Sequence, residues 1–187
     1  MKSFTGPCLI LLLATSATFA QSKLYTKAGN ISFKSKTAIQ DIEALNTKVL
    51  SVWETNSGNI EFSLLIKGFQ FEKALMQEHF NENYMESDKY PKALFKGVVE
   101  NSKNISLTTD NIVNTKVNGV LTMHGISRQI SIPAIIKIKN KEVSATTSFA
   151  VLLEDYNIKI PAVVAEKISK KINIQINIPA YKQLTTK

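Results

Sequence analysis

The sequence predicts an all-β fold, because apolar and polar residues alternate with a period of two along most of it. In 171–178, isoleucines at every second position are separated by lysine, asparagine and glutamine. Such alternation is typical of antiparallel sheets with one covered face and one wet face. Glycine and asparagine separate the runs, and one segment alone shows clear helical spacing.

The alternating runs predict the strands in chain order, with turns at Gly58-Asn59, Gly125 and Asn140-Lys141. The expected strands are 24–35, 41–56, 59–68, 93–101, 104–109, 114–123, 126–140, 141–154 and 170–181. Four runs place their apolar residues on one shared face. These sets are Ile60, Phe62, Leu64, Ile66; Ile130, Ile132, Ala134, Ile136, Ile138; Ala145, Thr147, Phe149, Val151, Leu153; and Ile172, Ile174, Ile176, Ile178.

One segment breaks this rhythm and predicts a helix of about three turns, from Phe71 to near Asn81. Its apolar residues recur at helical spacing from Phe71 through Ala74 and Leu75, and its alanine, leucine, methionine and glutamate favour helix. A second short helical piece is expected after Pro161, because proline is favoured in the first turn of a helix.

Many strands with little helix leave two architectures open, a two-sheet sandwich and a closed barrel. The long strand 126–140 followed at once by 141–154 suits an up-and-down barrel. A barrel of about eight strands has an interior just wide enough for side chains or for one slender ligand. Pro133 cannot donate to a strand ladder, so we expect a bulge or an edge there.

The N-terminus predicts a signal peptide at 1–20, followed by one domain at 21–187. Lys2 precedes an apolar stretch at 9–14, and a small-residue exit at Ala20 resembles an A-x-A cleavage site. The apolar run is short for a membrane span, and an uncleaved interfacial anchor is the alternative. We therefore expect a periplasmic or secreted protein.

Cys8 is the only cysteine in the chain, and it falls within the predicted signal peptide. The mature chain would then contain no disulfide, no cysteine nucleophile and no cysteine-ligated metal.

The formal net charge is +8, which is compatible with nucleic acid, anionic lipid headgroups or an acidic ligand. The lysines are spread along the strands, and no nucleic-acid-binding motif is present, so we expect no nucleic-acid partner. Transient contact with an anionic membrane surface and a homodimer stay open as partners.

The chain contains two histidines, His79 and His124, and neither stands in a metal-binding motif. The "HGIS" stretch places no carboxylate behind the imidazole of His124, and no G-x-S-x-G elbow is present. We expect both histidines to be structural groups in loops or at the rim of a barrel, with no metal and no cofactor.

Paired carboxylates occur as Glu154-Asp155 and as Glu86 with Asp88, both in expected loops. A solvated pair is the usual state in a loop, so neither predicts a glycosidase dyad. The residues therefore argue against an enzyme.

Two stretches together resemble the YceI-like family. "MQEHFNENYMESDKYPKALFKGVV" at 76–99 is similar to a family segment of acidic-His, aromatic, Tyr-Pro and Phe elements. "VNGVLTMHGISRQISIPA" at 117–134 resembles the family signature G-x-L-T-x-H-G-V-T. The family-motif residues that we single out are His79, Pro91, His124 and Gly125.

The resemblance implies a lipocalin-like antiparallel barrel with one short helix packed against it, and a polyisoprenoid-binding periplasmic protein. The leading hypothesis is thus an exported, non-enzymatic carrier that holds an isoprenoid or similar amphiphilic lipid inside the barrel. The candidate tunnel-lining residues are Phe62, Leu64, Phe80, Tyr84, Phe95, Leu121, Met123, Ile132, Phe149, Ile174 and Ile176.

Two other hypotheses stay open: a solid-core structural or partner-binding barrel of the cell envelope, and a histidine-dependent enzyme. The chain also departs from the family pattern. Met76 and Gln77 replace a basic-acidic pair, and Met85 replaces the second aromatic.

Overall fold

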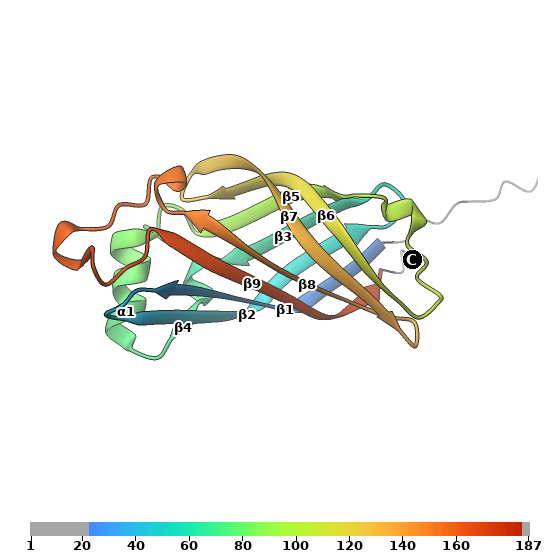
Figure 1. The fold of residues 1–187 in the computed structure, drawn as a ribbon, viewed down its shortest axis with the longest axis horizontal. Helices are drawn as coiled ribbons and strands as arrows, with labels where there is room; N and C mark the ends of the chain where they lie inside the picture. Colours follow the sequence, from blue (N-terminus) through green and yellow to red (C-terminus); the bar gives the residue numbers. More distant parts are fainter. Residues whose placement is uncertain (1–22, 185–187) are drawn as a thin grey trace, which may run out of the picture.

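The computed structural model describes residues 23–184, so the predicted signal peptide lies outside the described residues. The described chain forms one antiparallel meander that closes into a barrel (Figure 1). Its strands are β1 (Lys23–Lys36), β2 (Asp41–Glu54), β3 (Asn59–Leu65), β4 (Gln70–Phe71), β5 (Lys92–Val99), β6 (Asn111–Met123), β7 (Ile126–Lys139), β8 (Glu142–Leu152) and β9 (Lys171–Gln183).

The sheet order is β1-β9-β8-β7-β6-β5-β3-β2-β4, and a further pairing of β1 with β2 closes the ring. Within residues 23–184, the closed barrel thus uses eight strands, and β4 is an extra short strand beside β2. The predicted all-β barrel is confirmed, and the sandwich is excluded.

The inward faces are those that the alternation predicts. Along β9, Ile172, Ile174, Ile176 and Ile178 are all buried, and the residues between them are exposed. The expected turns also form. His124 and Gly125 have φ of 50° and 73°, and Asn140 and Lys141 have φ of 53° and 66°. Paired positive φ values are typical of the tight turns that match the twist of a β-hairpin.

The predicted strand 104–109 is wrong. This segment follows a 3-10 turn at Ser102–Asn104 and then runs irregularly to Asp110. Ser102 is buried, where its hydroxyl donates to the carbonyl of Thr55 at 2.7 Å. The Ser106 hydroxyl instead forms hydrogen bonds with the hydroxyls of Thr108 and Thr109 within the same loop. Local hydroxyl bonds of this kind compete with strand pairing.

The predicted strand 59–68 ends early, at Leu65, because a 3-10 turn at Ile66–Gly68 reverses the chain. The Asn46 side chain donates to the carbonyl of Leu65 at 3.0 Å and holds this turn. The chain then adds β4, which sequence reasoning missed, so Phe71 lies in a strand and not in the predicted helix.

The helical region begins later than predicted and ends later. α1 (Ala74–His79) continues directly into a π-helical turn, η2 (Phe80–Tyr84). The piece after Pro161 is one 3-10 turn, η5 (Ala162–Val164). In the described part of the chain, no helix is long and apolar enough to cross a membrane.

Near Pro133 the pairing between β7 and β8 ends. β7 pairs with β8 only from Ile135 to Lys139, while β7 and β6 stay paired throughout. Pro133 marks the point where the β7–β8 ladder stops, as expected for a residue that cannot donate. The 3-10 turn η4 (Glu154–Tyr156) contacts both strands beyond this point, and Tyr156 is only 1% exposed.

The barrel has two different ends. α1, the β1–β2 turn and the segment 153–170 lie at one end, which we call the open end (Figure 1). The opposite end, which we call the packed end, is filled by buried side chains around Trp53 and Tyr181, whose rings meet edge to face at 6.1 Å. The Tyr181 hydroxyl bonds to the Ser51 hydroxyl at 2.9 Å, and the Trp53 indole donates to Ser102 at 3.2 Å.

Candidate ligand-binding cavity

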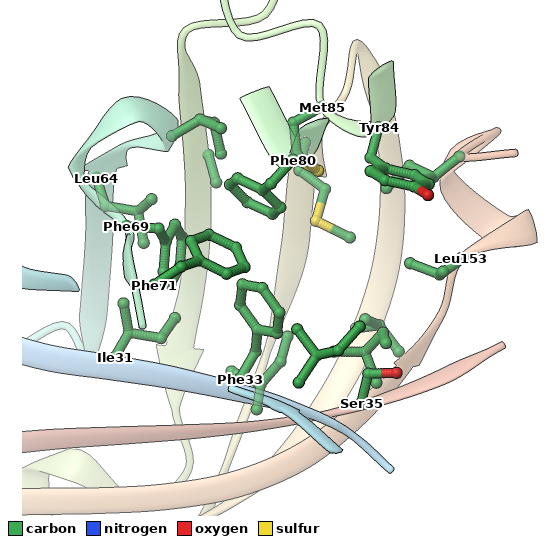
Figure 2. Close-up of a pocket in the computed structure, with 18 of the residues that line it drawn as sticks. Ile31, Phe33, Ser35, Leu64, Phe69, Phe71, Phe80, Tyr84, Met85 and Leu153 are labelled. Atoms are coloured by element: carbon green, nitrogen blue, oxygen red, sulfur yellow. The ribbon is translucent and has the colours of Figure 1, made fainter. Parts of the chain in front are cut away.

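An apolar cavity of about 280 Å³ occupies the barrel interior next to the open end (Figure 2). This volume is close to the lower limit of small-molecule pockets, about 300 Å³. The lining comes from the inner faces of the strands, from α1 and η2, and from 153–170. Two lining side chains are exposed, His79 and Lys167, and both lie at the open end. The cavity therefore reaches the surface there.

The strands that carry the predicted lining residues bring most of them together. Ten of the eleven line this cavity: Phe62, Leu64, Phe80, Tyr84, Phe95, Leu121, Met123, Phe149, Ile174 and Ile176. Ile132 does not line it. Ile132 is buried and pairs with Val117, and neither belongs to the lining. Ile132, which packs in the core, and Ile174 and Ile176, which line the cavity, all follow the same apolar–polar alternation. The sequence therefore does not distinguish a core residue from a cavity-lining residue.

A cluster of four phenylalanine rings forms one wall of the cavity, and sequence reasoning named only Phe80 among them. The Phe80 ring stacks on Phe33 at 5.4 Å and contacts Phe71 at 5.0 Å and Phe69 at 5.6 Å (Figure 2). Phe69 and Phe71 alternate in the sequence just before the helix, which was an available signal. Aromatic clusters bury large areas, so this cluster anchors the helical region to the barrel.

The π-helical turn η2 and the residue that follows it place side chains in the lining of the cavity. Phe80, Tyr84 and the buried Met85 all line the cavity, and burial raises the pKa of the Tyr84 hydroxyl. Isolated π-helical turns are frequent at functional sites. Met76 and Met85, two of the positions that depart from the family pattern, are both part of the lining.

Polar lining groups concentrate at the open end. Ser35 and Gln40 come from the β1–β2 hairpin, His79 from α1 and Lys167 from the segment after η5. The backbone N–H of Ser169 donates to the Ser35 hydroxyl at 2.8 Å, which ties this last segment to β1. The cavity thus has an apolar interior and a partly polar rim.

The two sequence motifs meet beside this rim. The Tyr90 ring lies edge to face on the His124 ring, with centroids 4.8 Å apart. A Cβ on Gly125 would lie 2.6 Å from the Tyr90 ring, and Gly125 has a φ of 73°. Glycine is therefore required there for two independent reasons. Pro91 accepts a hydrogen bond from the Ile66 backbone N–H at 2.9 Å.

His124 is buried, with both ring nitrogens bonded. Its Nε2 lies 2.9 Å from Oε2 of Glu86, and its Nδ1 lies 2.8 Å from the carbonyl oxygen of Tyr156. The expectation that no carboxylate stands behind this imidazole is wrong, because Glu86 arrives from a loop 38 residues earlier in the chain. Asp88, its partner in the sequence, pairs instead with Lys67.

The two histidines do not form one site. His124 joins the η2–β5 loop to η4, while His79 is exposed on α1, and no hydrogen bond links the two among residues 23–184. In the same part of the chain, no group of three or more His, Cys, Asp or Glu side chains is arranged to hold a metal ion.

A closed eight-stranded antiparallel barrel, packed at one end and hollow at the other, defines a lipocalin-like barrel. The chain belongs to the family of the YceI-like domain, whose family model matches residues 15–180.

Solved structures agree with this fold. A polyisoprenoid binding domain from Saccharophagus degradans has a TM-score of 0.75 at 13% identity, covering 88% of this chain and 99% of that chain. Burkholderia cenocepacia BcnA has a TM-score of 0.65 at 11% identity, covering 82% and 96%. The YCEI protein of Campylobacter jejuni has a TM-score of 0.54 at 15% identity, covering 100% of both. The comparison with curated protein sequences gives no match.

Proposed function

We propose that this protein is an exported carrier that holds the apolar chain of an isoprenoid or similar amphiphilic lipid in the barrel cavity. The observation that carries the proposal is the cavity itself, whose interior is lined by aliphatic and aromatic side chains. Burial of an apolar chain there removes it from water, which is favourable in proportion to the apolar area covered. Family membership and the polyisoprenoid binding domain from Saccharophagus degradans support a ligand of this class.

The polar rim determines the orientation of the ligand in the cavity. The apolar chain occupies the interior, and its polar head lies at the open end near His79 and Lys167, the two exposed lining residues. The Lys167 ammonium is suited to an anionic head such as a phosphate. Replacement of Lys167 by glutamine should then weaken binding of a prenyl phosphate more than binding of the corresponding prenyl alcohol.

The binding role carries no catalytic step. His124 is occupied by two structural hydrogen bonds, and the cavity interior offers no acid–base pair among the described residues. Export is proposed from the N-terminal sequence, and a periplasmic or secreted location follows from it. The mass of protein recovered from the envelope or the medium tests it, with cleavage after Ala20 as the expected result.

Lipid uptake is tested by blocking the cavity while leaving the fold intact. Ala93 faces inward opposite Leu64 and lines the cavity, so Ala93→Phe should fill space that the ligand needs. Ala150 is exposed on β8, so Ala150→Phe is the matched control on the outer face. Titration with a fluorescent prenyl lipid should show at least tenfold weaker binding (about 1.4 kcal/mol) for Ala93→Phe and no change for Ala150→Phe.

A failure to bind any prenyl lipid, in both the wild type and the Ala150→Phe control, would contradict the proposal. The protein would then be a structural or partner-binding barrel with no bound lipid. Native mass spectrometry of protein purified from its own source gives a second readout, because a bound lipid adds its mass to that of the chain.

A further inference from the structure

We propose that the open end docks on the surface of a phospholipid bilayer, with Ile39, Leu75 and Val163 inserted among the lipids. The inference rests on the proposed function, because it supplies the route by which a lipid reaches the cavity. It adds a partner, a bilayer, and a set of contact residues.

The exposed fractions of these three side chains single them out. Val163 is 88% exposed, Leu75 is 61% exposed and Ile39 is 59% exposed. Among the other large apolar residues that the structure describes, Ile112 at 62% and Leu65 at 56% are similarly exposed. Single exposed apolar residues are ordinary on a protein surface. Here, however, three of the four most exposed large apolar side chains lie at the same end of the barrel, which is a cluster and not a random scatter.

The three residues come from three separate segments of the open end. Ile39 lies in the β1–β2 turn, Leu75 in α1 and Val163 in η5 (Figure 1). Each is the direct chain neighbour of a residue that lines the cavity, namely Gln40, Met76 and Val164. The exposed apolar side chains therefore surround the place where the cavity reaches the surface.

Isolated exposed side chains on separate segments are better suited to contact with a bilayer than with a protein partner. A stable protein interface needs a continuous, complementary patch of about 800 Å² on each partner. A lipid surface adapts to isolated side chains, and apolar residues that enter it are removed from water.

Charge favours an anionic bilayer, through the molecule as a whole rather than through the rim. Four lysines and four carboxylates lie in or next to the three segments that carry these side chains, so the rim itself carries both signs. The lysines are Lys36, Lys73, Lys167 and Lys170, and the carboxylates are Asp41, Glu72, Glu78 and Glu166. The net charge of +8 includes Lys2 of the predicted signal peptide, so the mature chain carries about +7, which attracts it to an anionic surface. Insertion of the three apolar side chains then holds it there.

Docking in this orientation places the mouth of the cavity against the lipids. An apolar chain then passes between bilayer and cavity without crossing water, where its exposure is unfavourable.

Vesicle flotation tests the docking without any prenyl lipid. The probe is a vesicle of phosphatidylcholine and phosphatidylglycerol, and the variant is Ile39→Ser/Leu75→Ser/Val163→Ser. Loss of three inserted side chains should weaken vesicle binding by at least about tenfold. Ile112→Ser is the matched control, because Ile112 is equally exposed but lies on the barrel wall in β6, and it should bind vesicles like the wild type.

A fluorophore reports insertion directly. A nitrobenzoxadiazole label on Val163→Cys should shift to the blue on addition of vesicles, and the same label on Ile112→Cys should not, both in the mature chain from Gln21, which contains no other cysteine. Equal flotation of the triple variant and the wild type, or equal shifts at the two labels, would overturn the proposal. So would a wild type that self-associates in sedimentation through these residues and does not float with vesicles.

Transfer kinetics separate this inference from the proposed function. The triple variant should bind a prenyl lipid in detergent solution as the wild type does, yet deliver it to vesicles at least about tenfold more slowly. Ala93→Phe should lose lipid binding and keep vesicle flotation. A wild type that floats but binds no prenyl lipid would contradict the carrier function and leave docking supported. Unchanged transfer by the triple variant would overturn the docking proposal alone.

Discussion

The imidazole of His124 lies 2.9 Å from the Glu86 carboxylate through Nε2, and its Nδ1 lies 2.8 Å from the Tyr156 carbonyl. The ring thus uses both nitrogens to join two loops that border the cavity. The Tyr90 ring meets the imidazole edge to face, with ring centroids 4.8 Å apart. The motif histidine thus has a structural role at the rim, and it is not among the residues that line the cavity.

Removal of this imidazole should destabilise the fold. His124→Ala leaves the buried Tyr156 carbonyl and the Glu86 carboxylate without their shared partner, which should lower the free energy of unfolding by about 2–4 kcal/mol. Urea unfolding measures the change. His79→Ala is the control, because His79 is exposed and should change stability by less than about 0.5 kcal/mol. Equal effects of the two substitutions would contradict the assigned role.

Gly125 should be intolerant of alanine. A methyl group there would meet the Tyr90 ring, and the φ of 73° is strained for alanine. We expect Gly125→Ala to lower the free energy of unfolding by more than about 1 kcal/mol. The steric part is isolated by comparison in a Tyr90→Ala background, where the cost of Gly125→Ala should be smaller. An unchanged cost in that background would show that backbone strain alone matters.

Alanine substitutions at two isoleucines should distinguish the packed core from the cavity wall by their cost in stability. Ile132 is buried away from the cavity, so Ile132→Ala should cost about 2–5 kcal/mol. Ile174 faces existing empty space, so Ile174→Ala removes fewer contacts and should cost clearly less. Chemical denaturation of the lipid-free protein measures both. Equal costs would indicate that the barrel is solid throughout.

Alkaline pH should weaken the packed end through Tyr181. Burial raises the pKa of Tyr181 to about 12, from an ordinary value near 10. The folded state favours the neutral phenol, so this contribution is complete below about pH 10 and is lost as the pH rises toward 12. The loss is about 2–3 kcal/mol. Tyr181→Phe keeps the ring and should show a shallower decline in unfolding free energy over this range, although its starting value is lower because the bond to Ser51 is gone. Parallel declines would contradict the assignment.

The sequence predicts the barrel well because one physical pattern, alternation of burial, governs every long strand. It fails where local polar bonds override that pattern. The segment 104–109 alternates serine and threonine with apolar residues, but its hydroxyls bond within the loop and it forms no strand. The 3-10 turn before β4 depends on Asn46, a partner 19 residues earlier than Leu65.

The candidate site is predictable only in part. Inward-facing apolar positions follow from alternation, and ten of the eleven named residues line the cavity. The division between core and cavity depends on how the barrel ends are filled, by Trp53 and Tyr181 at one end and by η2 and 153–170 at the other. Long-range pairs such as Glu86 with His124 follow no local spacing.

Photocrosslinking tests the central claim most directly. A prenyl lipid with a diazirine at the far end of its chain is bound, irradiated and mapped by mass spectrometry of peptides. Our account predicts crosslinks to cavity residues such as Phe62, Phe149 and Ile174, and their loss in Ala93→Phe. Crosslinks confined to the outer wall, or retained in Ala93→Phe, would contradict a lipid held inside the barrel.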